Sequence, residues 1–247
     1  MSTDLTRLLE EWPYDSENSI RVITAEDGRN VLQVRQPLGI EQYELDGRPD
    51  GQRPEGFETV LDYIEHELAE YETTHGSDQG FELEDSAATL LQNEGVLFYY
   101  RYLLLFQLND FERVIRDTAH NLRICDLLER FAADEEDAEA VLQFKPYIYR
   151  MNSVSRAMAL VQRHEHAEAR NVLEAAIEVI QEMSDVDTPA FQFERVRSVN
   201  YLRSALEQIE EAPGDPVTEL ERELEAAVQE EDYERAARLR DHIRELS

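Results

Sequence analysis

Alternation of apolar and polar residues dominates the first part of the chain. It spans residues 20–24 and again residues 31–35, and the Asp27-Gly28 dipeptide between them is typical of a tight hairpin turn. A third alternating stretch, residues 39–45, leads into a segment rich in Asp, Gly and Pro, which favours turns. The sequence therefore predicts a small three-stranded antiparallel meander.

The next segment changes to a helical spacing. Its apolar side chains recur three and four positions apart, which places them on one face of a helix. They are Phe57, Val60, Leu61, Ile64 and Leu68. A small sheet is only marginally stable in water without a cover. We therefore expect this helix to pack on the sheet, and the polar stretch 73–80 to form an exposed linker.

From Ser86 onward the helical spacing continues almost without interruption. We expect long helices near residues 86–107, 110–132, 136–163, 166–183 and 189–211. Asp110 is a residue type that caps helix N-termini, and Pro146 should begin a new helix or kink an existing one. The joints at Asn109-Asp110 and at 164–166 resemble those of tetratricopeptide-like (TPR-like) repeats.

Helix-breaking residues separate the last part of the chain from the rest. After Pro213, Gly214 and Pro216, apolar residues return at helical spacing over 220–228 and again over 233–246. The polar break between these two stretches predicts a hairpin of two amphipathic helices.

The expected fold class is thus mostly α with a small antiparallel β-meander at the N-terminus (α+β). We expect a meander plus helix over residues 1–75, a TPR-like helical bundle over 81–211, and the helical hairpin over 217–247.

Charge narrows the possible partners. Asp and Glu number 55 against 24 Lys and Arg, so the formal net charge is -31. Such an acidic surface repels a phosphate backbone and favours basic or cationic partners, so we expect no direct contact with nucleic acid. No apolar stretch approaches the roughly 20 residues of a membrane helix. Residues 1–4 begin no signal or transit pattern, and we therefore expect a cytoplasmic protein that binds no membrane.

Motifs for catalysis, metals and nucleotides are weak or missing. The chain has no glycine-rich phosphate loop and no Gly-x-Ser-x-Gly elbow. Cys125 lies in an apolar helical pattern, without the basic neighbours that activate a thiol. His164 and His166 suit a surface turn better than a metal site, and the Glu72-x-x-His75 match has no second copy. We expect no catalytic residue, no metal and no cofactor.

The second helix of the predicted hairpin resembles a known motif. Its string Glu-Asp-Tyr-Glu-Arg-Ala-Ala-Arg-Leu-Arg-Asp-His-Ile, residues 231–243, is similar to the UVR motif of nucleotide-excision repair subunits, arginine-kinase activators and some Clp-type ATPases. The resemblance implies a protein–protein element that docks on another copy of itself or on a partner's related hairpin. The expected contact residues are Tyr233, Ala236, Ala237, Leu239, Arg240 and Ile243. The alternative is a hairpin that folds back onto its own bundle.

A second candidate surface lies in the turn-rich segment after the third strand. Residues 32–54 resemble a pattern in uncharacterised bacterial proteins that end in the same motif, and this resemblance implies no activity. Arg48, Asp50 and Arg53 lie there among Gly and Pro residues, and polar loop side chains can form recognition sites. A purely structural turn is the alternative.

The leading hypothesis is a non-catalytic adaptor that dimerises or recruits a protein through its hairpin, in DNA excision repair or in protein quality control. A second hypothesis places a small-molecule or enzymatic site between the N-terminal sheet and the bundle. Its expected apolar pocket has tyrosine walls: Tyr99, Tyr100, Tyr102, Tyr147 and Tyr149. A third is a structural protein that only assembles with itself.

Overall fold

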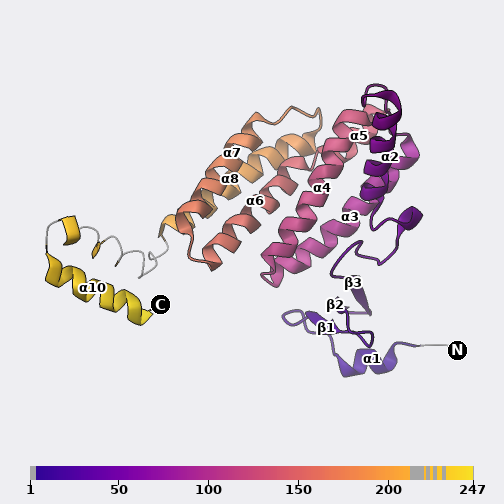
Figure 1. Ribbon diagram of the computed structural model, residues 1–247. Coiled ribbons are helices and arrows are strands. Elements are labelled where there is room, and N and C mark those ends of the chain that lie inside the picture. Colours follow the sequence, from indigo (N-terminus) through magenta and orange to yellow (C-terminus); the bar gives the residue numbers. More distant parts are fainter. Residues whose placement is uncertain (1–3, 212–219, 221–222, 225–226, 230–231, 247) are drawn as a thin grey trace.

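The computed structural model describes residues 4–211, 220, 223–224, 227–229 and 232–246. Figure 1 shows a small sheet at one end of a stack of long helices, and a last helix that lies apart from this stack. The predicted fold class, mostly α with a small N-terminal antiparallel meander, is confirmed. None of the described helices is long and apolar enough to cross a lipid bilayer.

The sheet has the predicted strands in the predicted order. A short helix, α1 (Thr6–Glu11), precedes β1 (Ile20–Thr24), β2 (Asn30–Gln36) and β3 (Gly39–Glu44), and the strand order is β1-β2-β3. Gly28 has a φ of 86°, a left-handed conformation that glycine adopts without strain, and its amide donates to the Ala25 carbonyl at 2.9 Å. This turn fixes the register in which Val22 lies opposite Leu32.

The stacked helices follow a short 3-10 turn, η1 (Pro54–Gly56). They are α2 (Val60–His75), α3 (Asp85–Gln107), α4 (Phe111–Phe131), α5 (Glu135–Leu142), α6 (Lys145–Gln162), α7 (His166–Glu182) and α8 (Pro189–Glu211). The helix expected over 136–163 is therefore divided in two. Pro146 lies in the first turn of α6, where a proline costs no helical hydrogen bond. The sequence predicts that Pro146 either begins a new helix or kinks an existing one, and in the structure it begins a new helix.

The two predicted joints share a backbone conformation. Asn109 before α4 has a φ of 57°, and His164 before α7 has a φ of 63°. Such single left-handed residues reverse the chain at the end of a helix. Asp110 caps α4 as predicted, because its carboxylate accepts from the Arg113 amide at 3.3 Å. The likeness to TPR repeats itself stays a prediction.

The expected packing of α2 on the sheet is wrong. Leu61 and Ile64 of α2 belong to a core cluster with Leu91 of α3 and with Ile124 and Leu128 of α4. The sheet instead buries apolar side chains against the end of the stack; this cluster contains Leu32, Leu45, Tyr102, Leu105, Val114 and Met151. Because the stack already covers the sheet, the apolar face of α2 packs on α3 and α4.

A buried ion pair attaches the segment after β3 to the helices. The Arg101 guanidinium of α3 donates to both carboxylate oxygens of Asp117 of α4, at 2.6 and 2.8 Å, and both side chains are fully buried. Arg101 also donates to the carbonyl oxygens of Glu44 and Gly47, at 2.9 and 2.8 Å. Charge-assisted hydrogen bonds therefore join the end of the sheet to the stack, in addition to apolar contacts.

A second buried carboxylate holds the start of α2. Glu94 of α3 accepts from the amides of Val60 and Leu61, at 2.8 and 3.0 Å, and lies 3.2 Å from Nε2 of His120 on α4. Burial opposes the ionisation of Glu94, but the hydrogen bonds from His120 and the two amides outweigh it and lower the pKa of this carboxyl. Glu94 therefore acts as an N-terminal cap supplied by a neighbouring helix.

Candidate protein-interaction hairpin

The last helix begins at a tight turn. Helix α10 (Tyr233–Leu246) follows Asp232, whose carboxylate accepts from the Arg235 amide at 3.0 Å. The Asp232 amide donates to the Ala227 carbonyl at 2.9 Å, so the end of the preceding helical segment lies directly beside the start of α10. Residues 230–231 of the predicted break lie outside the described residues. The described residues thus form the predicted reversal between two helical segments.

The inner face of the hairpin combines small alanines with larger apolar residues. Ala227 is buried in the first segment, and Ala236 is only 8% exposed in α10. Leu239 and Ile243 are half-buried, and their spacing from Ala236 places all three on one side of the helix. An alanine at this position permits the two segments to approach closely. Ala236, Leu239 and Ile243 therefore face the interior of the hairpin.

The outer face is more exposed. Tyr233 is 69% exposed and Val228 of the first segment is 50% exposed, although both are large apolar or aromatic residues. Ala237 and Arg240 follow Tyr233 at four and seven positions, so these three residues share a second side of α10. The predicted contact set therefore comprises an inner and an outer face, and its role in partner contact stays a prediction.

Charge differs between the two segments. The first has acidic residues at 219, 221, 223, 225 and 230 and one arginine at 222, whereas α10 has four arginines, at 235, 238, 240 and 244, and three acidic residues, at 234, 241 and 245. One pair already joins the segments, because Arg235 lies 3.2 Å from the Glu223 carboxylate. In sequence, the first segment is therefore acidic and α10 is the more basic of the two.

The candidate recognition loop is partly structural. Arg48 is largely buried, and its Nε lies 3.3 Å from Glu94 and 3.5 Å from Asp50. Arg53 is exposed and lies 3.7 Å from Glu58. Arg48 and Arg53 both line a groove next to α2. The Arg48 contact holds the loop on α3, whereas a recognition role for Asp50 and Arg53 stays a prediction.

The predicted tyrosine pocket exists, but in a different place. Tyr99, Tyr100, Tyr102 and Tyr147 line a cavity of about 430 Å³ that also involves α4, α5 and α8. It lies within the helical stack, so the expected position between the sheet and the bundle is wrong. Tyr149 does not line it and instead packs in a core cluster of α6, α7 and α8.

Sequence reasoning missed the polar residues that α4 and α8 contribute to this cavity. Asn121, Glu194 and Arg197 come from α4 and α8, far along the chain from the tyrosines of α3. Each occupies an ordinary position in a helical pattern, so only the packing of the helices brings them together.

The cysteine and histidine side chains bear on whether the protein has a reactive thiol or a metal site. Cys125 is fully buried, and this burial raises the pKa of its thiol to about 12. Among the residues that the structure describes, no group of three or more His, Cys, Asp or Glu side chains is placed to hold a metal ion. The buried His120 ring, which sequence reasoning missed, stacks on Phe98 with the ring centroids 3.7 Å apart.

Comparison with known proteins identifies the hairpin alone. Residues 215–247 match the family model described as UVR, the UvrB/uvrC motif. No curated protein and no solved structure matches the chain. The chain therefore contains a UVR motif, and the described part of that motif is the helical hairpin that ends in α10.

Proposed function

We propose that this protein is a non-catalytic adaptor that dimerises or recruits a protein partner through its UVR hairpin. The observation that carries the proposal is the exposure of Tyr233, at 69%, on an element that matches a protein-interaction motif. Aromatic side chains are enriched at protein interfaces because they bury a large area with few rotatable bonds.

The small size of the hairpin supports association. Two short helices bury little apolar surface, and such a unit gains stability when a second helical pair completes a four-helix bundle. Val228 and Tyr233, both half or more exposed, offer the apolar surface for this contact.

Charge supports a complementary partner. The arginines of α10 suit an acidic helix, and the chain's own first hairpin segment is one. A second copy of the hairpin therefore fits, because in a two-fold arrangement each copy contributes both surfaces. Another protein's hairpin with the same asymmetry fits equally.

The cellular process in which the adaptor acts depends on which protein its hairpin binds. The motif's occurrence in repair subunits, kinase activators and Clp-type ATPases favours DNA excision repair or protein quality control. The formal net charge of -31 disfavours contact with a phosphate backbone. In a repair role the protein would therefore act through a protein partner and not through DNA.

Light scattering coupled to size-exclusion chromatography tests the proposal on the full chain and on a truncation that ends at Glu211. We expect the full chain to be a dimer and the truncation a monomer. If both are monomers, addition of an isolated UVR hairpin from a repair or Clp-type protein should produce a complex with the full chain only. A full chain that forms neither a dimer nor a complex contradicts the proposal.

Two matched substitutions locate the interface. Tyr233→Glu places a charge on the outer face and should dissociate the dimer or complex. Leu38→Glu is the control, because Leu38 is 92% exposed and lies in the turn between β2 and β3. It should leave association unchanged; equal effects of the two substitutions would show that the contact is not specific to the hairpin.

A further inference from the structure

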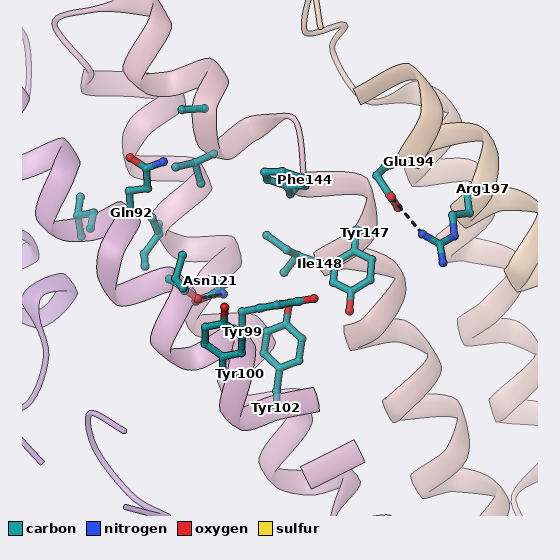
Figure 2. A pocket seen from close by; sticks show the side chains of 16 residues that line it. Gln92, Tyr99, Tyr100, Tyr102, Asn121, Phe144, Tyr147, Ile148, Glu194 and Arg197 are labelled. Atoms are coloured by element: carbon teal, nitrogen blue, oxygen red, sulfur yellow. Dashed lines mark hydrogen bonds and ion pairs between the residues drawn. The ribbon is translucent and has the colours of Figure 1, made fainter. Parts of the chain in front are cut away.

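The cavity in the helical stack is a second candidate site, independent of the hairpin. Figure 2 shows the tyrosines of α3 and Asn121 on one side, Phe144, Tyr147 and Ile148 beside them, and Glu194 and Arg197 on α8. Its volume, about 430 Å³, is within the range of small-molecule sites. Its walls are mainly apolar and aromatic.

Four tyrosines form most of the aromatic part of the cavity wall. The Tyr99 ring centroid lies 5.5 Å from those of Tyr100 and Tyr102 and 6.0 Å from that of Tyr147, with interplanar angles of 56°, 89° and 62°. The rings are thus inclined to one another and do not form a single parallel stack. Inclined rings are an ordinary packing arrangement, and they present both ring edges and ring faces to an enclosed group; the face of an aromatic ring attracts an organic cation.

Two polar atoms of lining residues have no hydrogen-bond partner. Asn121 donates from Nδ2 to the Gly95 carbonyl at 2.9 Å, but among the described residues nothing donates to its buried Oδ1. Glu194 lies 3.4 Å from Arg197 through Oε1, and its buried Oε2 likewise has no donor within the described part of the chain. Both orphaned atoms are acceptors. A ligand that satisfies them must therefore bring N–H or O–H donors.

Gly95 is one of the residues that line the cavity. It lies in the middle of α3, where glycine is less favourable than alanine. A Cβ atom built there would lie 3.8 Å from both Oδ1 of Asn121 and Cδ1 of Ile124, which is ordinary van der Waals contact. Packing therefore does not demand a glycine at this position. The room that it leaves lies in the wall of the cavity.

We propose that this cavity binds a small organic cation, with an aromatic or apolar body and a protonated amine. The aromatic walls take the body, and the amine donates to the buried Oε2 of Glu194. The strongly acidic chain raises the local concentration of such cations. Arg150 and Arg197 are positively charged and therefore repel a cation. The Arg150 guanidinium carbon lies 4.8 Å from the ring centroid of Tyr147, which lines the cavity. The test must therefore include an anion of the same shape.

Three probes that differ only in the polar group provide this test on the full chain: 2-phenylethylamine, 2-phenylethanol and phenylacetate, each titrated by calorimetry. We expect the amine to bind saturably at a single site and at least tenfold more tightly than the alcohol. The acid should bind most weakly. Equal binding of amine and alcohol, tighter binding of the acid, or no saturable binding of the amine would overturn the proposal.

Matched variants connect the binding to the cavity. Glu194→Gln keeps the shape and removes the charge, so the affinity for the amine should fall at least tenfold while that for the alcohol is unchanged. Glu207→Gln is the control on the same helix, because Glu207 is exposed and does not line the cavity. A Glu194→Gln variant that binds the amine as the unmodified chain does would refute the assignment.

Filling the cavity gives an independent readout. Gly95→Leu should abolish amine binding, and Gly95→Ala should weaken it while the melting temperature stays equal or rises, because alanine favours the helix. If both Gly95→Ala and Gly95→Leu bind the amine as tightly as the unmodified chain, the amine does not bind in this cavity. None of these results depends on the oligomeric state of the hairpin.

Discussion

At the scale of single residues, the most consequential contacts are those that a linear pattern hides. Asp117 and Arg101 are fully buried and charged, yet each occupies an ordinary position in a helical sequence. Glu94 accepts from backbone amides 33 and 34 positions away. Periodicity shows which face of a helix is apolar, but it does not show which charged residue that face will enclose with a partner.

The Arg101 and Asp117 pair leads to a prediction for stability. Asp117→Asn leaves the Arg101 guanidinium buried without its counter-charge, and we expect it to destabilise the fold by about 3 to 5 kcal/mol in urea unfolding. Asp46→Asn is the control, because Asp46 is an exposed carboxylate 2.7 Å from Arg116 and should change stability little. If the two substitutions have similar effects, the buried pair does not hold the sheet on the stack.

At the scale of elements, the sequence predicts more reliably what forms than what packs together. The strands, the joints at Asn109 and His164 and the C-terminal hairpin all follow from short-range signals. The partner of α2 and the position of the tyrosine cavity do not. Both depend on how separate helices dock, and an apolar stripe such as that of α2 fits several apolar surfaces equally well.

The hairpin allows a sharp test of its two faces. Ala236→Glu places a charge inside the hairpin, so α10 should lose helix content by circular dichroism and association should be lost with it. Its neighbour Ala237 lies on the side of Tyr233, so Ala237→Glu should keep the helix content and still weaken association. If Ala236→Glu retains both helix content and association, the division into inner and outer faces is wrong.

At the scale of the whole molecule, charge should have opposite effects on the stability of the fold and on the association of the hairpin. The formal net charge of -31 repels itself in the compact state, and added salt screens this repulsion. The proposed hairpin contact instead joins the arginine-rich α10 to an acidic segment, and screening weakens it. Composition alone predicts the first effect, whereas the second requires the arrangement of charges along the hairpin.

Salt should therefore stabilise the fold and dissociate the assembly. As NaCl rises from about 0.05 to about 0.5 M, the Debye length shortens from about 14 to about 4 Å, and we expect a higher melting temperature by calorimetry and a smaller mass by light scattering. Tyr233→Glu provides the control, because an already dissociated chain should show only the rise in melting temperature. A mass that is constant across this range would mean that apolar contacts of Tyr233 and Val228, and not charge, hold the hairpins together. A melting temperature that falls would mean that ion pairs within the stack outweigh the repulsion of its acidic surface.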